Sequence, residues 1–116
     1  FDVLAEERGY TASHQVLTRH GGIDSGAGRK AASILEDAGI ITNMNMLPGD
    51  TKAMSPSGLR LGVQELTRHG MGVEEMEQVA ECFRRVLIDG EEPRKVKETV
   101  NYIRSNFQDV RYCFRD

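Results

Sequence analysis

The sequence predicts an α+β fold, in which a small and mostly antiparallel sheet is covered on one face by about three helices. Short apolar segments typical of strands alternate with longer stretches in which apolar residues recur at helical spacing. Glycine and proline separate these segments, and 116 residues are enough for one domain with its own core. Residues 1–116 are therefore interpreted as a single domain with helices packed on one sheet.

The first half of the chain predicts two strands and one helix. Residues 1–7 alternate roughly between apolar and polar, which favours a short strand, and a second strand is predicted over His14–Thr18. A glycine-rich connector follows, in which Ser25 is a candidate cap for a helix over Ala27–Ala38. Gly39 is expected to end that helix. The inward face of the helix is predicted to carry Ala31, Ile34, Leu35 and Ala38.

The second half predicts two strands and two helices. A strand over Ile40–Asn45 leads through a Pro-Gly-Asp turn to a strand over Gly58–Leu61. A long apolar stripe predicts a helix over Val73–Ile88. Pro93 suits the first turn of a last helix, which is predicted over Arg94–Asn106.

Composition excludes several classes of protein. A net charge of −3, from 15 basic and 18 acidic residues, argues against a nucleic-acid-binding module. No apolar run approaches the roughly 20 residues that cross a membrane. Cys82 and Cys113 form no metal-binding pattern, and two reduced, buried thiols in a cytoplasmic protein are expected. Because the first residue is Phe1, the chain is interpreted as part of a longer or processed protein.

Two polar features stand out on the predicted strands. Arg60 is the only charged residue of the stretch SPSGLRLG, and glycines on both sides permit close approach of a ligand. An arginine fixed on a strand can bind a carboxylate or phosphate through two parallel hydrogen bonds, although an ordinary exposed side chain on an edge strand is the alternative. Asn43 and Asn45 share one face of their strand, where they either form a binding surface or simply contact water.

These segments resemble a known family. The stretches GIITNMNMLPGD (residues 39–50) and SPSGLRLGVQELTRHGM (55–71) are similar to the C-terminal small domain of serine hydroxymethyltransferases. YTASHQVL (10–17) resembles a further segment of the same domain. These enzymes are fold-type I pyridoxal-phosphate enzymes that interconvert serine and glycine with tetrahydrofolate.

The resemblance implies a role for each candidate residue. Arg60 would bind the α-carboxylate of the amino-acid substrate, with Ser57 assisting, and Asn45 would contact the folate pterin, with Ser55 as a weaker candidate on the cofactor side. No catalytic residue and no metal ligand is implied in this chain. The lysine that binds pyridoxal phosphate belongs to a larger domain that is absent here, so the chain alone is expected to hold no cofactor and to be inactive. The parent enzyme would bind serine, glycine and folate and would form a homodimer or tetramer.

Two alternatives remain open from the sequence. After the Arg-x-Gly pattern this chain has VQELTRHG, where the family commonly has Thr-Pro-Ala, which is compatible with a divergent branch. A folate-independent threonine transaldolase or aldolase homologue would keep Arg60 but would not need Asn45. A non-catalytic binding module built on the same domain is the third interpretation.

Overall fold

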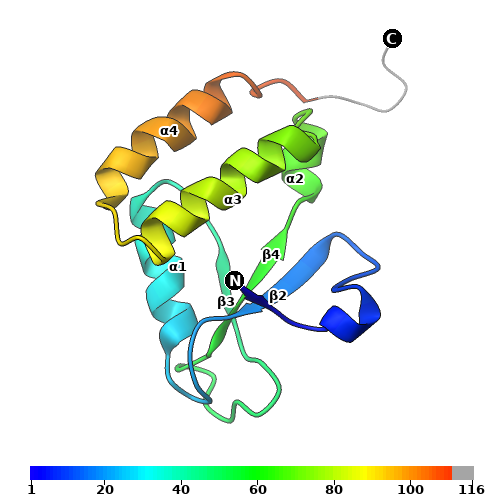
Figure 1. Ribbon diagram of the computed structural model, residues 1–116, viewed down its shortest axis with the longest axis vertical. Helices are drawn as coiled ribbons and strands as arrows, with labels where there is room; N and C mark the ends of the chain where they lie inside the picture. The colour runs from blue at the N-terminus through cyan, green and yellow to red at the C-terminus, as the bar shows by residue number, and fades with distance from the viewer. Residues whose placement is uncertain (111–116) are drawn as a thin grey trace.

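The computed structural model describes residues 1–110 as an α+β fold, which confirms the predicted class (Figure 1). A four-stranded antiparallel sheet has the order β1-β2-β4-β3. The strands are β1 (Asp2–Val3), β2 (Gln15–Arg19), β3 (Asn43–Asn45) and β4 (Gly58–Gly62). The helices are the short 3₁₀ helix η1 (Glu6–Arg8), α1 (Ala27–Asp37), α2 (Gln64–Arg68), α3 (Val73–Leu87) and α4 (Pro93–Ser105).

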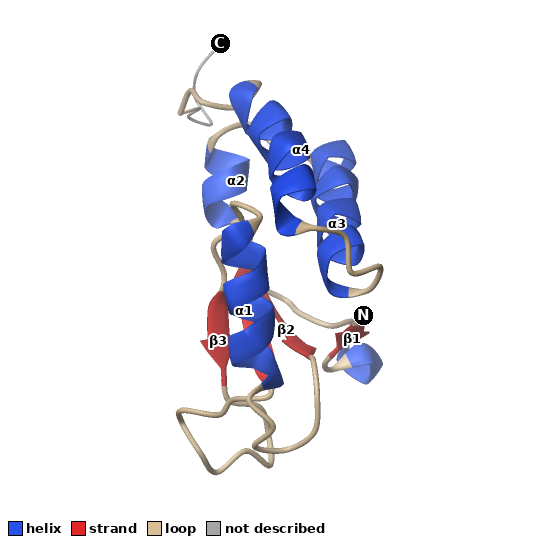
Figure 2. Cartoon of the chain, turned by 90° about the vertical axis from the view of Figure 1, so that its left-hand side faces the viewer, coloured by secondary structure: helices blue, strands red, loops and turns tan. Residues whose placement is uncertain are grey.

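The helices form two successive layers on one side of the sheet. Helix α1 lies directly against β3 and β4, and α3 and α4 pack against α1 and against each other (Figure 2). The prediction of helices on one face is therefore correct, but only α1 covers the strands closely.

The strand register assigns each side chain to a face. Leu17, Arg60 and Asn43 form one row across β2, β4 and β3, on the face opposite α1. The neighbouring row has Leu59 at its centre, which is fully buried under α1. Alternation along β4 therefore separates a core residue from an exposed arginine one position later. We call the face that carries Arg60 the open face of the sheet.

The core lies between the sheet, α1 and the two long helices. Leu35, Leu59 and Val96 have no exposed surface, and Cys82 is a buried free thiol, as expected. Cys113 lies outside the described residues. Ile34 was predicted to face inward but is 39% exposed, because α1 buries the narrower stripe of Ala31, Leu35 and Ala38.

Strand β3 is shorter than predicted, and the end of α1 explains the difference. Gly39 has a left-handed φ of 80° and donates its N–H to Glu36, while Ile40 donates its N–H to Leu35 at 2.8 Å. These two bonds are the Schellman pattern that closes a helix. Ile40 therefore belongs to the helix terminus, and pairing with β4 begins only at Asn43.

Two local details complete the comparison with the sequence. Helix α2 was not predicted, because its five residues contain a single apolar side chain and show no periodicity. At the start of α1 the Ser25 hydroxyl accepts the N–H of Ala27, although Gly26 occupies the cap position itself. None of the helices in residues 1–110 combines the length and the apolar character that a membrane span needs.

Candidate functional site

Arg60 occupies the centre of β4, on the open face of the sheet. Its side chain is exposed, and within residues 1–110 its guanidinium makes no hydrogen bond or ion pair. By contrast Arg19, at the edge of the same face, lies 3.8 Å from the carboxylate of Asp2. Arg60 thus presents unused donors from a strand that is paired on both sides, which is the arrangement that suits an anionic ligand.

The two asparagines of β3 lie beside Arg60. Asn43 is its direct cross-strand partner, and Asn45 is paired with Gly58, so Asn45 is a diagonal neighbour of Arg60 on the same face. The Asn45 amide donates to the carbonyl oxygen of Met46 at 2.7 Å, which leaves its amide oxygen and one N–H available. The structure therefore brings Arg60 and Asn45 together on one surface.

Ser57 is placed differently from Arg60 and Asn45. It has no exposed surface, and its hydroxyl donates to a carboxylate oxygen of Asp50 at 2.7 Å. Ser55 is half-buried in the same loop, where its carbonyl oxygen accepts the N–H of Gly26 at 3.2 Å. Both serines thus hold the loop that precedes Arg60, and neither belongs to the open face.

Asp50 is the functional candidate that sequence reasoning missed. Besides the Ser57 hydroxyl, its carboxylate accepts the backbone N–H groups of Asp24 at 2.9 Å, Leu47 at 2.8 Å and Ser57 at 2.9 Å. These hydrogen bonds hold the pKa of Asp50 well below its usual range, and the bond from the Asp24 N–H has the largest effect. In the sequence, Asp50 is only an aspartate that follows Pro-Gly. This pattern predicts a turn, but it does not predict the distant residues that Asp50 contacts.

Asp24, in the loop after β2, accepts hydrogen bonds from the loop that contains Asp50. Its carboxylate accepts the Thr51 hydroxyl at 2.6 Å and the N–H groups of Thr51 at 2.7 Å and Lys52 at 2.8 Å. The hydroxyl, followed by the two N–H groups, lowers the pKa of Asp24. Together Asp24 and Asp50 tie the loop after β2 to the loop between β3 and β4, and we call this pair the aspartate clamp.

Close backbone contact reinforces the clamp. A Cβ added to Gly28 would lie 2.2 Å from the carbonyl oxygen of Gly58, so only glycine allows α1 to pack this close to β4. The Gly28 N–H also donates to the carbonyl oxygen of Pro56 at 3.1 Å. The start of β4 is therefore fixed by α1 as well as by Asp50.

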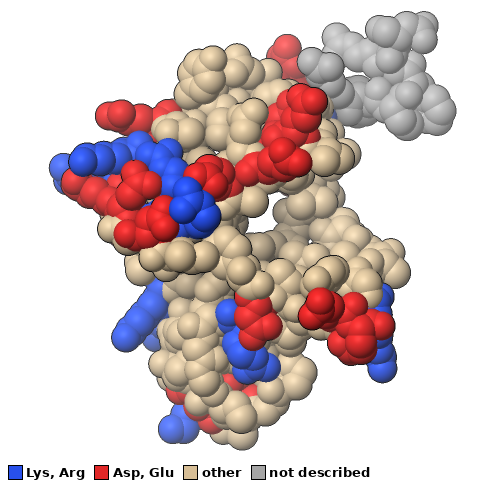
Figure 3. Space-filling model, viewed as in Figure 1, with Lys and Arg blue, Asp and Glu red and all other residues tan. Residues whose placement is uncertain are grey.

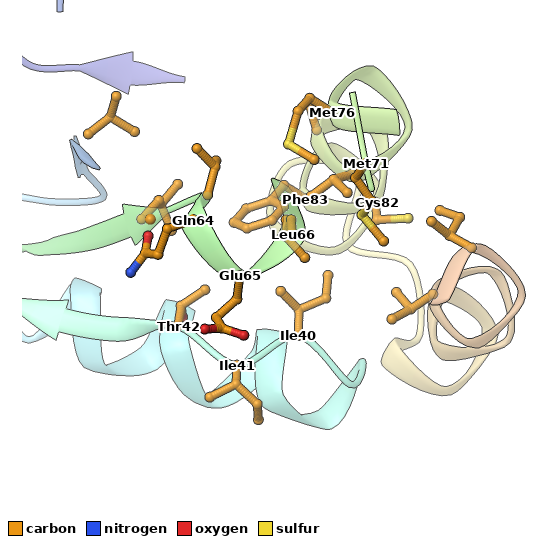
Figure 4. Close-up of a pocket in the computed structure, with 18 of the residues that line it drawn as sticks. Ile40, Ile41, Thr42, Gln64, Glu65, Leu66, Met71, Met76, Cys82 and Phe83 are labelled. Carbon is orange, nitrogen blue, oxygen red and sulfur yellow. The ribbon is translucent and has the colours of Figure 1, made fainter. Parts of the chain in front are cut away.

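At the other end of β4 the molecule is hollowed. A cavity of about 950 Å³ lies between the sheet and the layer of α3 and α4, and Figure 3 shows the hollow between the two parts. Figure 4 shows Leu66 and Phe83 in this cavity, with Ile40 on the opposite wall. Two polar atoms at its lining, Thr42 Oγ1 and His69 Nδ1, are buried without a partner in residues 1–110. We call this cavity the cleft.

The donor set on the open face fits a substrate carboxylate better than it fits an aldehyde cofactor. An aldehyde cofactor needs an amine nucleophile, and the four lysines of the chain are exposed on α1, on α4 and in the loop before β4. No lysine lies on the sheet strands. The open face instead offers a guanidinium and amides, which bind anions and hydrogen-bonding rings.

Comparison with known proteins identifies the relatives of this chain. A family model described as serine hydroxymethyltransferase matches residues 8–83. The serine hydroxymethyltransferase of Thermococcus gammatolerans is 50% identical over 116 residues, and that of Thermoplasma volcanium is 47% identical over 121. These matches cover 98% and 100% of this chain but 27% of each relative.

A solved structure is also similar. The L-threonine transaldolase from Pseudomonas fluorescens, in its internal aldimine state, superposes with a TM-score of 0.78 and 30% identity. The match covers 91% of this chain and 23% of that protein. Because the family model covers most of the chain and the curated relatives are about half identical along its length, this chain belongs to the serine hydroxymethyltransferase family.

Proposed function

We propose that this chain is the C-terminal small domain of a pyridoxal-phosphate-dependent serine hydroxymethyltransferase. In this proposal the whole enzyme interconverts serine and glycine with tetrahydrofolate. Arg60 binds the α-carboxylate of the amino acid, and Asn45 contacts the folate pterin. The observation that carries the proposal is that the Arg60 guanidinium, which has no partner among residues 1–110, lies on the open face next to the asparagines of β3.

The chemistry of Arg60 explains why this residue is suited to the role. A planar guanidinium binds both oxygens of a carboxylate at once, which fixes the orientation of the Cα bonds as well as the position of the substrate. Pyridoxal phosphate, when bound to the rest of the enzyme, supplies the electron sink for cleavage of a Cα bond. Arg60 contributes binding and orientation, and its side chain is exposed.

Asn45 is suited to a pterin because an amide both donates and accepts hydrogen bonds. Its side chain lies diagonally beside Arg60, so one surface could hold the amino acid and the folate as neighbours. Ser57 contributes to substrate binding by fixing the loop before Arg60, since its hydroxyl is already bonded to Asp50. Ser55, whose carbonyl oxygen contacts α1, supports the same loop.

The remaining parts of the proposal concern the whole protein. The chain spans 27% of the length of its curated relatives, so a large cofactor-binding domain is proposed as its principal partner. The neighbour's internal aldimine state is consistent with a lysine-bound pyridoxal phosphate in that domain. The chain by itself holds no cofactor and does no chemistry in this proposal, and the parent assembles as a homodimer or tetramer.

The proposal is tested by replacing Arg60 in the full-length enzyme. Arg60→Ala should weaken amino-acid binding about tenfold to a hundredfold, the equivalent of a charge-assisted hydrogen bond of roughly 1.5–3 kcal/mol, and should lower turnover further. Arg60→Lys keeps the charge but not the paired geometry, so it should also fail. Equilibrium binding of glycine and steady-state kinetics measure both effects.

A matched control is available on α4. Arg94 is an exposed arginine without a charged partner in residues 1–110, and Arg94→Ala should leave glycine binding unchanged. The assignment of Arg60 is wrong if Arg60→Ala binds glycine as tightly as the unmodified enzyme. In that case Arg60 is an ordinary exposed side chain on the sheet.

A threonine transaldolase is the second candidate, because a protein of that activity is the structural neighbour at 30% identity. The higher identity of the curated hydroxymethyltransferases favours the first candidate. The two differ at Asn45: Asn45→Ala should weaken tetrahydrofolate and spare glycine in a hydroxymethyltransferase. Cleavage of threonine that is unaffected by tetrahydrofolate, in the unmodified enzyme, would support the transaldolase.

A further inference from the structure

The carboxylate of Asp50 joins the loop after β2 to both ends of the loop between β3 and β4. One oxygen accepts the N–H of Asp24, in the loop after β2, and the other accepts the N–H of Leu47, just after β3. The second oxygen also accepts the N–H and the hydroxyl of Ser57, just before β4. One ionised side chain therefore satisfies four donors at the point where β3 ends and β4 begins.

These bonds lie next to the proposed binding residues. Leu47 is two positions after Asn45, and Ser57 is three positions before Arg60. Asn45 and Gly58 are the last pair of the β3–β4 ladder, so Asp50 bridges the two strands directly beyond it. Because Asn45 lies at this end of the ladder, a shift in the bridge would displace Asn45 relative to β4 more directly than Asn43.

The ladder alone is a weak means of fixing that separation. Strand β3 contributes three residues, and residues 46–57 connect it to β4 as a long loop instead of a tight hairpin turn. A loop of this length loses conformational entropy when its ends are brought together, and short ladders fray at their ends. The three bonds to Asp50 from Leu47 and Ser57 close the loop where a two-residue turn would otherwise do so.

The carboxylate of Asp24 contacts a different part of this loop. It accepts hydrogen bonds from Thr51 and Lys52, which lie in the middle of the loop and not at the strand ends. Asp24 thus stabilises the loop without touching the residues adjacent to Asn45 or Arg60. The aspartate clamp contains one member that reaches the strand ends and one that does not, which supplies a matched control.

We infer that Asp50 is a positioning residue, which acts through Leu47 and Ser57 to set the spacing between Asn45 and Arg60. This inference rests on the proposed function, because the spacing matters only if Arg60 binds the amino acid and Asn45 binds the folate. Asp50 would hold the carboxylate-binding guanidinium and the pterin-binding amide at the distance that lets the amino acid and the folate bind side by side. It does not touch either substrate.

The experiment compares four variants of the full-length enzyme that carries this domain. Asp50→Asn keeps the shape but replaces one of the two acceptor oxygens with an NH2 donor, so it loses either the bond from Asp24 or the three bonds from Leu47 and Ser57. Asp24→Asn is the matched control, and Ser57→Ala removes only one of the four bonds. The double variant of Asp50→Asn with Arg60→Lys completes a double-mutant cycle with Asp50→Asn and with the Arg60→Lys enzyme that tests the proposed function.

Kinetics are measured at a temperature at which circular dichroism shows each variant to be folded. Asp50→Asn should lower kcat/KM for serine about tenfold to a hundredfold and raise KM for both serine and tetrahydrofolate. Asp24→Asn should lower the melting temperature but leave both KM values within about twofold. If Asp50→Asn does not fold, Ser57→Ala decides the question, with an expected rise of about threefold in both KM values.

The outcomes separate this inference from the proposed function. Unchanged KM values in folded Asp50→Asn, with only a lower melting temperature, would show a purely structural role and overturn the inference. Additivity of Asp50→Asn and Arg60→Lys would overturn it as well, because a residue that acts through Arg60 must lose its effect when Arg60 is impaired. The proposed function fails independently, if Arg60→Ala retains normal glycine binding.

Discussion

The two ends of β4 differ in how tightly they are packed and in how many of the polar groups around them are hydrogen-bonded. At the Gly58 end, backbone packs against α1, and the aspartate clamp satisfies donors from three segments. At the Gly62 end, β4 runs into α2 and borders the cleft, where Thr42 and His69 keep buried polar atoms without a partner in residues 1–110. The proposed site lies between these ends.

This contrast shows that order in a small domain need not come from its apolar core. The Gly58 end is held by hydrogen bonds to carboxylates and by contact between glycines, whereas the Gly62 end is lined by half-buried side chains such as Leu66 and Phe83. A charge-assisted bond is directional, so it fixes positions that apolar contact would leave adjustable. The following predictions test this difference between the two ends.

The largest effect is expected where α1 meets β4. Gly28→Ala would place a methyl group 2.2 Å from the carbonyl oxygen of Gly58, so the helix must move away from the strand. We expect a loss of about 3 kcal/mol of unfolding free energy, measured by urea denaturation. Gly22→Ala is the matched control, because a methyl group there meets nothing within 4 Å, and its effect should stay within about 0.5 kcal/mol.

A comparable loss of stability is expected in the core, and a smaller one at the cleft. Leu35, on the inner face of α1, is fully buried, so Leu35→Ala should cost about 3 kcal/mol. Phe83→Ala removes more atoms but should cost only about 1–2 kcal/mol, because Phe83 is half-buried at the cleft. Urea denaturation of both variants measures the difference. The reverse order would show that the cleft side of α3 is packed as tightly as the core.

The smallest effect is expected from acid. The pKa values of Asp24 and Asp50 are lower in the folded chain than their ordinary value, so both carboxylates stabilise the fold fully above about pH 5. This contribution is lost as the pH falls below about 4 and the carboxylates become protonated. Asp50→Asn should therefore show a shallower fall in unfolding free energy between pH 5 and pH 3.

Urea midpoints at pH 7, 5 and 3 measure that slope in both proteins. Glu81 and Glu91 also have lowered pKa values, owing to Arg84 and Arg85, so part of the acid dependence should remain in the variant. Identical slopes in the two proteins would mean that the clamp contributes nothing to acid stability.

The sequence predicted most of the elements because their signals are local. The periodic stripes of α1, α3 and α4, the stop at Gly39 and the position of Pro93 all act within a few residues. The strand at Arg60 was likewise predicted, although it lies between β2 and β3 and is not the edge strand of the alternative interpretation. These features needed no knowledge of tertiary contacts.

The missed features depend on residues that are far apart in the chain. Asp24 and Asp50 interact across a separation of 26 positions, and neither residue carries a local sign of its partner. The burial of Ser57 follows from that same contact. The shortening of β3 arose because the N–H of Ile40 bonds to the end of α1 instead of to a neighbouring strand. The periodicity of the sequence cannot distinguish these two possibilities.

The strand order has a consequence for how this chain folds. The central pair joins β2 to β4, residues 15–19 to residues 58–62, and encloses α1 and β3 in the loop that it closes. Closing so long a loop has a large entropic barrier, whereas α3 and α4 are adjacent in sequence and can associate at once. The helical pair should therefore form early and the sheet late, so that the surface bearing Arg60 is among the last parts of the chain to acquire its final shape.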